Sequence, residues 1–114
     1  MDSVIGGRLS ALVEHSQDII MIVDEEGTIS FVNEAVDRIL GYESDEMTGT
    51  NAFEYIHPDD REVVVDRFSD VINNLEHVTD RSTHRLQHAD GHWEWFESVG
   101  SNRTNYGARW IRHQ

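Results

Sequence analysis

Apolar and polar residues alternate with a helical period over residues 58–75. Asp and Arg dominate the polar positions, and Pro58, the only proline of the chain, opens the stretch. Proline fits the first turn of a helix, where its missing N–H would have no partner. The pattern therefore predicts one long helix over this stretch. Its apolar face recurs at steps of four, three, one and three, at Val64, Phe68, Val71, Ile72 and Leu75.

Shorter apolar segments on both sides of this helix have the character of β-strands. An apolar run and an alternating run meet at an acidic turn that ends in Gly27, which predicts a hairpin over residues 19–32. After the helix, the Asp90-Gly91 pair lies between two further runs and is a strong hairpin signal. We expect a three-stranded meander over residues 79–113.

Short helices are expected elsewhere. An amphipathic pattern predicts a helix over residues 8–16. Within residues 33–56, Asn33 and Ser44 are predicted N-cap residues, and Gly41 is predicted to follow the first short helix. A long helix between an early hairpin and a later meander indicates the α+β class, with an antiparallel sheet covered on one face.

The composition limits the classes of protein. A length of 114 residues corresponds to one domain, which we assign to residues 1–114. No run of 18 apolar residues and no secretory signal is present, so we expect a cytoplasmic location and no membrane contact in this segment. The chain has no cysteine, which excludes disulfides, thiolate nucleophiles and thiolate metal sites.

The charge balance points to an adaptation to salt. Asp and Glu total 22 against nine basic residues, all of them Arg, and the formal net charge is −13. Such a chain repels itself in dilute buffer, whereas at molar salt the Debye length falls to about 3 Å and the repulsion is screened. We therefore expect a halophilic protein. Because the sequence offers no basic patch, we expect no nucleic-acid partner.

Four short pieces of the sequence stand in an informative order. They are residues 22–29 with 32–35, residues 39–42, residues 56–61, and Asp90-Gly91 followed by Trp95. Together they make the chain resemble a PAS domain, of the kind found in halophilic archaeal signal-transduction proteins, and the resemblance covers nearly the whole chain. It implies a five-stranded antiparallel sheet in strand order 2-1-5-4-3, with short helices and one long helix on one face.

The resemblance also implies a role. PAS domains are sensory or interaction modules in histidine kinases, chemotaxis transducers, cyclic-dinucleotide enzymes and transcription regulators. They hold a ligand or cofactor between the helices and the sheet, or they dimerise. Family members often continue through an Asp-Ile-Thr-like motif, and this chain stops before one. We expect one domain of a larger signalling protein, whose output domain lies elsewhere in the same protein.

The resemblance allows the sequence to be checked for the residues with which PAS domains bind known cofactors. The blue-light flavin subgroup carries a Gly-x-Asn-Cys motif, and residues 49–52 read Gly-Thr-Asn-Ala at the corresponding place. Because Ala52 has no sulfur, a covalent flavin adduct is excluded there, and a cysteine-linked chromophore is excluded for the whole chain. Oxygen-sensing PAS domains use a His near the end of the long helix, which makes His77 the only haem candidate. A lone His after a helix end is usually solvated, which argues against haem.

Three further histidines invite a metal-site interpretation. His84 and His88 share one predicted strand face, and His88 and His92 flank the second hairpin turn. With no acidic or thiolate partner recognised at a fixed short spacing, a polar strand face is favoured over a metal site. No nucleophile, Gly-rich phosphate loop or acid–base pair is recognisable, so we expect no enzyme.

The leading hypothesis is a sensory module that binds a small apolar or aromatic molecule in its core. Binding would shift the domain between two arrangements that the output domain reads. For most of the expected lining residues, plain core packing is the alternative interpretation. The expected lining is Ile20, Ile22, Phe31, Ile39, Phe53, Ile56, Val64, Phe68, Ile72, Leu86, Trp95 and Ile111.

The alternative hypothesis is a ligand-free dimerisation or relay module of a histidine kinase or transducer. Residues 93–99 carry aromatic side chains on both faces of a predicted strand, and the helix predicted over residues 8–16 is amphipathic. Either surface would suit a homodimer interface.

Overall fold

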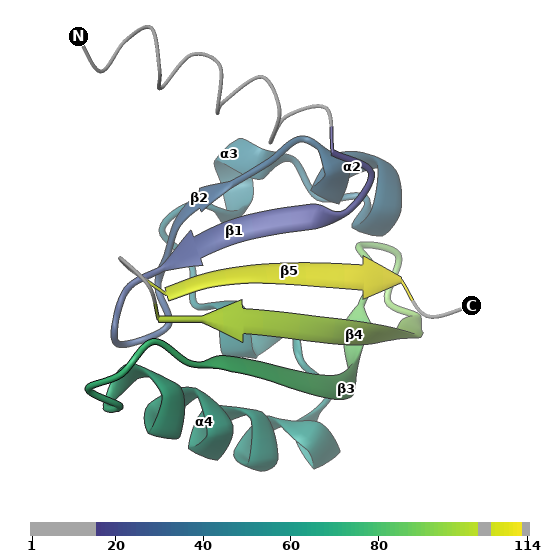
Figure 1. The fold of residues 1–114 in the computed structure, drawn as a ribbon. Helices are drawn as coiled ribbons and strands as arrows, with labels where there is room; N and C mark the ends of the chain where they lie inside the picture. The colour runs from purple at the N-terminus through teal and green to yellow at the C-terminus, as the bar shows by residue number, and fades with distance from the viewer. Residues whose placement is uncertain (1–15, 103–105, 113–114) are drawn as a thin grey trace, which may run out of the picture.

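The structure is a computed structural model that describes residues 16–102 and 106–112. A five-stranded antiparallel sheet in the order β2-β1-β5-β4-β3 forms one layer (Figure 1). Its strands are β1 (Ile19–Val23), β2 (Ile29–Val32), β3 (Thr79–Gln87), β4 (Trp93–Ser101) and β5 (Tyr106–Arg112). This confirms the α+β class and the strand order that the resemblance implied. The helix expected over residues 8–16 lies, apart from Ser16, outside the described residues.

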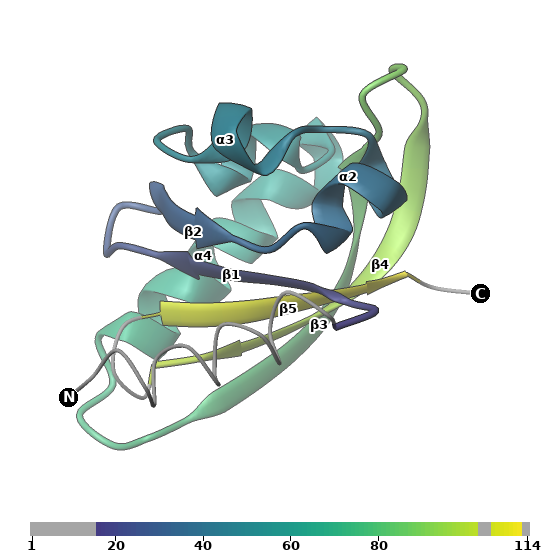
Figure 2. The ribbon, with the colours of Figure 1, turned by 90° about the horizontal axis from the view of Figure 1, so that it is seen from above.

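The second layer consists of helices on one side of the sheet, as Figure 2 shows. The longest helix, α4, lies beside β3 at one edge of the sheet (Figure 1). No helix in the described part of the chain is long and apolar enough to cross a membrane. The helices are α2 (Ala35–Leu40), α3 (Ser44–Met47), the 3₁₀ helix η1 (Ala52–Tyr55) and α4 (Pro58–Ile72).

The turn between β1 and β2 follows from its acidic sequence. The carboxylate of Asp24 accepts hydrogen bonds from the backbone N–H groups of Glu26 and Thr28, both at 2.9 Å. Gly27 has a φ of +89°, which side chains disfavour. These contacts close the hairpin and start β2 in the register that pairs Ile22 with Phe31.

Asn33 does not cap a helix, contrary to the sequence prediction. Its side chain is buried, its Oδ1 accepts the N–H of Ile20 at 3.0 Å, and its Nδ2 donates to the carbonyl of Asp18 at 3.0 Å. The carboxamide therefore satisfies backbone groups at the start of β1, and α2 begins two residues later without a side-chain cap. Sequence alone shows an Asn before a helix but not the distant strand that it serves.

The prediction for Ser44 is also corrected. Ser44 is the first residue of α3, and the N-cap residue is Glu43. Glu43 and Glu46 form a capping box, in which the N–H of Glu43 donates to Oε1 of Glu46 at 2.8 Å. Two glutamates thus perform the reciprocal bonding that a Ser or Thr usually begins.

The long helix is shorter than its periodicity predicted. It begins at Pro58 as expected, but it ends at Ile72, and Leu75 is fully exposed in the following loop. The Nδ2 group of Asn102 donates to the carbonyls of Val71, Asn74 and Glu76 at 2.8–3.1 Å. The last turn of a helix leaves backbone carbonyl groups without partners. The Asn102 side chain, which follows β4, bonds to carbonyls at and after the helix end and so stabilises the end of α4 at this point.

Candidate functional site

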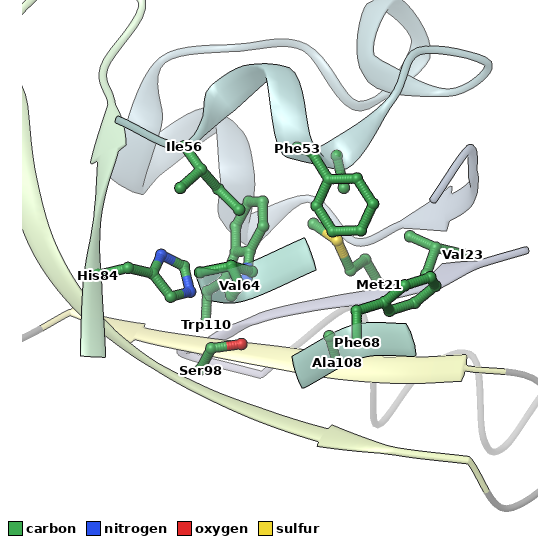
Figure 3. Close-up of a pocket in the computed structure, with 11 residues that line it drawn as sticks. Met21, Val23, Phe53, Ile56, Val64, Phe68, His84, Ser98, Ala108 and Trp110 are labelled. Atoms are coloured by element: carbon green, nitrogen blue, oxygen red, sulfur yellow. The ribbon is translucent and has the colours of Figure 1, made fainter. Parts of the chain in front are cut away.

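A small cavity of about 30 Å³ lies in the core between the helices and the sheet (Figure 3). Residues from both layers enclose it, and nine of the eleven are apolar. The helical layer contributes Ala52 and Phe53 of η1, Ile56 between η1 and α4, and Val64 and Phe68 of α4. The sheet contributes Met21 and Val23 of β1, His84 of β3, Ser98 of β4, and Ala108 and Trp110 of β5.

Two aromatic rings form one wall of the cavity. Phe53 and Phe68 meet edge to face, with ring centroids 5.1 Å apart. The backbone N–H of Phe53 donates to Oδ1 of Asn51 at 2.9 Å, which starts η1. The Phe53 ring also packs over Gly27, where a Cβ atom would lie 2.5 Å from its Cε2. The first hairpin and η1 together therefore position this wall.

Among the described lining residues, the two with polar side chains, His84 and Ser98, come from neighbouring strands. His84 of β3 is 1% exposed, and Ser98 of β4 is 9% exposed. Figure 3 shows the His84 ring extending from β3 towards Val64, with Ser98 and Trp110 nearby. The rings of His84 and Trp110 are near perpendicular, with centroids 6.5 Å apart. One end of an otherwise apolar cavity is thus polar.

Burial keeps the His84 ring uncharged at neutral pH. The loss of solvation lowers its pKa to about 4, and the negative charge of Asp60 opposes this shift. Neither ring nitrogen has a hydrogen-bond partner among the described residues. Because a neutral imidazole has one donor and one acceptor, both are left for a molecule in the cavity.

Four of the twelve expected lining residues line this cavity, namely Phe53, Ile56, Val64 and Phe68. Three others belong to the same core but lie outside the cavity lining. Leu86 is fully buried and bridges to Ile56, while Ile39 and Ile72 are partly buried against the core.

The remaining five expected residues do not line the cavity. In β1, the buried residues alternate with Ile20 and Ile22, which are only partly buried. Ile22 pairs with Phe31, and the outer positions of β4 and β5 likewise pair Glu97 with Ile111. Paired residues share a face of the sheet, so these side chains lie on the face away from the cavity. The five are Ile20, Ile22, Phe31, Trp95 and Ile111.

The sequence analysis missed seven lining residues. Six of them were missed because the opposite face of a strand lines the cavity or because they belong to the short η1 helix. The seventh is His84. The alternation of His84 with the apolar Leu86 was the available signal for its burial, because side chains two apart share a face. The missed residues are Met21, Val23, Ala52, His84, Ser98, Ala108 and Trp110.

The other histidines considered as cofactor or metal ligands, His77, His88 and His92, do not line the cavity. His77 is exposed in the loop after α4 and does not line the cavity. His88 and His92 stack with centroids 4.6 Å apart. Asp90, the acidic partner that the sequence analysis passed over, contacts His92 Nδ1 and lies 3.3 Å from His88 Nδ1. The possible ligand atoms of His88, Asp90 and His92 lie within 4.8 Å of one another, so this set could hold a divalent ion. The contacts among the same three residues also close the hairpin turn between β3 and β4.

Comparisons with known proteins agree with this architecture. The family described as PAS fold matches residues 7–112, and the chain belongs to this family of sensory modules. Over 86 residues, 72% of this chain, it is 33% identical to hypoxia-inducible factor 1-alpha of Oncorhynchus mykiss. The chain spans only 11% of the length of that relative.

Two solved structures illustrate the likeness of fold. The PAS domain of an HTR-like protein from Haloarcula marismortui has a TM-score of 0.79 at 24% identity, covering 97% of this chain and 99% of that one. The PAS domain of the quorum-sensing receptor RpfR from Cronobacter turicensis, in complex with BDSF, has a TM-score of 0.74 at 15% identity. That match covers 90% of this chain and 99% of the other.

Proposed function

We propose that this PAS domain is a non-catalytic sensory module that binds a small, largely apolar molecule in its core. The bound state is relayed to an output domain of the same protein. The observation that carries the proposal is the cavity, which is enclosed by apolar side chains of both layers and has a polar end. The RpfR domain, which shares the fold, is a receptor with a bound molecule.

The size of the cavity sets a condition on binding. A volume of about 30 Å³ holds one or two water-sized groups, so an organic molecule enters only if lining side chains move. Phe53 and Val64 are only partly buried, and Met21 has a flexible thioether chain that adapts to irregular spaces. Ligand binding then displaces η1 and α4 relative to the sheet, which is a change of shape that a neighbouring domain can read.

Filling the cavity tests this proposal. Phe68→Trp places a larger ring in the cavity, whereas Val63→Trp adds the same ring to a side chain of α4 that is 60% exposed. The three proteins are purified in molar potassium chloride and denatured, and the released molecules are analysed by mass spectrometry. We expect a stoichiometric organic molecule from the wild type and Val63→Trp, and loss of it from Phe68→Trp. Equal retention by all three would place the ligand outside this cavity.

A relay module that dimerises without a ligand is the second candidate. It is supported by Trp93 and Trp95, which are 36% and 49% exposed. The guanidinium of Arg85 lies 5.0 Å from the centre of the Trp95 ring, on the outer face. Light scattering in molar salt tests this alternative, because a homodimer through this face is weakened by Trp95→Ser. A domain that stays monomeric at high concentration contradicts it.

The setting of the domain is also a proposal. We propose a cytoplasmic, salt-adapted signalling protein of a halophilic archaeon, based on the net charge of −13 and the absence of lysine and cysteine. The HTR-like protein with the same fold comes from Haloarcula marismortui, which supports this setting. A histidine kinase or transducer is the output that we propose for it.

A further inference from the structure

The polar end of the cavity restricts the chemistry of the ligand. His84 presents two ring nitrogens that have no hydrogen-bond partner in the described part of the chain, and Ser98 stands on the adjacent strand. A buried polar atom without a hydrogen-bond partner destabilises the protein, because it has lost its bonds to water and gained none. A molecule that supplies a hydrogen-bonding group at this end removes this destabilisation, whereas a purely apolar molecule does not.

The charges around the cavity restrict it further. The described lining contains no Arg. Arg85, which follows His84 in the sequence, is held by Asp60 at 2.8 and 3.0 Å. Other Arg side chains next to lining residues also have partners: Arg67 binds Asp80, Arg109 pairs with Asp18, and Arg61 donates to the carbonyl of Ile56 at 2.9 Å. A carboxylate at the polar end would face the uncharged His84 and the Ser98 hydroxyl and would meet no Arg of the described lining, which is unfavourable for a buried charge. An ammonium group there would equally lack a carboxylate partner in the described lining.

We infer that the ligand is an uncharged molecule with an apolar body and one hydroxyl group, held by His84 and Ser98; this inference rests on the proposed function. A hydroxyl both donates and accepts, as a neutral imidazole does. It can donate to one ring nitrogen of His84 or accept from it, and it can exchange a second hydrogen bond with the Ser98 hydroxyl. The apolar body then packs against Phe53 and Phe68.

Three aromatic probes of similar size separate the possibilities. Phenol is neutral with a hydroxyl, toluene is neutral without one, and benzoate is anionic at neutral pH. Each is titrated into the full chain in molar potassium chloride, and binding is followed by the NMR signals of the Met21 methyl group and the Phe53 ring. We expect phenol to bind at least about tenfold more tightly than toluene, with benzoate weakest.

Variants assign the preference to the polar end. His84→Phe keeps an aromatic ring but removes both ring nitrogens, so the advantage of phenol over toluene should disappear while toluene binding is retained. His77→Phe, at an exposed histidine, is the matched control and should keep the advantage. If His84→Phe does not fold, Ser98→Ala carries the test, because a smaller phenol-to-toluene ratio is expected there too.

The outcomes distinguish the two proposals. Toluene binding as tightly as phenol, or benzoate binding most tightly, overturns the hydroxyl inference and leaves the core-binding function standing. An unchanged phenol advantage in both His84→Phe and Ser98→Ala overturns it as well. If none of the three probes shifts the Met21 or Phe53 signals, the core-binding function fails and the inference fails with it.

Discussion

Asp60 of α4 and Arg85 of β3 form a two-pronged ion pair that joins the long helix to the edge of the sheet. Nε and Nη2 of Arg85 donate to the two carboxylate oxygens at 3.0 and 2.8 Å, and the backbone N–H of Arg85 donates to the same carboxylate at 2.9 Å. Because His84 immediately precedes Arg85 in β3, the pair also orients the strand segment that carries the polar end of the cavity.

Removing this pair should destabilise the fold. Hydrogen bonding from Arg85 lowers the pKa of Asp60 to about 2, compared with an ordinary 3.8. A depressed pKa means that the stabilisation is present above about pH 4 and is lost as the pH falls towards 2. We expect Asp60→Asn to lower the free energy of unfolding by about 1–2 kcal/mol at pH 7. Urea denaturation across this pH range measures the effect.

Asp59 provides the control for that prediction. Its carboxylate is 78% exposed at the start of the same helix. Asp59→Asn should lower stability by only a few tenths of a kcal/mol, through the helix dipole. Equal losses in both variants would show that the ion pair contributes nothing beyond helix charge.

Protonation of His84 should make the domain less stable in mild acid. Burial lowers the pKa of His84 from 6.5 to about 4, so the unfolded chain binds the proton more readily than the folded one. The free energy of unfolding therefore decreases as the pH falls from about 6.5 to about 4, by on the order of 2–3 kcal/mol from this group. Denaturation of the wild type and His84→Phe in molar salt gives this contribution by difference. A pH slope that the variant retains in full would assign it to other groups, and His77→Phe should retain it.

Gly27 should be more sensitive to substitution than another glycine with the same kind of backbone. Gly27 and Gly91 have φ angles of +89° and +102°, where side chains are strained. An added Cβ would collide with Phe53 at Gly27 but meets nothing within 4 Å at Gly91. We expect Gly91→Ala to destabilise by about 1–2 kcal/mol and Gly27→Ala by about 1–3 kcal/mol more.

The difference between these two variants isolates the contact with the cavity wall. Thermal or urea denaturation measures the stability of each, and the NMR signal of the Phe53 ring reports its displacement. Losses of the same size, with an unmoved Phe53 signal, would contradict the close packing of the hairpin on this ring.

The fold should require salt. The chain carries a formal net charge of −13. Part of its acidic surface is a hollow between α2 and α3, whose lining includes Asp37, Glu43 and Asp45. We expect the melting temperature to rise by several degrees between low-salt buffer and molar potassium chloride, because salt screens this repulsion. A double variant, Asp37→Asn with Asp45→Asn, should depend less on salt. A melting temperature indifferent to potassium chloride would refute the salt adaptation.

Local sequence signals predicted most of the elements. The positions of Pro58, Gly27 and Asp90-Gly91 located the long helix and two hairpins, since turn and cap chemistry acts within a few residues. The end of the long helix was not predictable in this way. Asn102, 30 positions beyond Ile72 in the chain, binds the carbonyls around the helix end.

The phase of the strands is where the cavity prediction failed. β1 reads Ile-Ile-Met-Ile-Val, so both faces are apolar and the two-residue period does not show which face is buried. The adjacent Trp110 and Ile111 of β5 present the same ambiguity. α4 has a clear polar face, and Val64 and Phe68 of its apolar face line the cavity.

The sequence by itself determined the element order, the α+β class, the acidic surface and the absence of cysteine chemistry, because these depend on composition and on neighbours along the chain. Tertiary structure decided which strand faces enclose the cavity. It brought His84 and Ser98 into the lining of one cavity, and it brought the Asn33 side chain to the backbone at the start of β1. Such choices depend on burial against residues far apart in sequence. The same His residue is an ordinary polar side chain on an open strand and an uncharged, unpartnered one in a closed core.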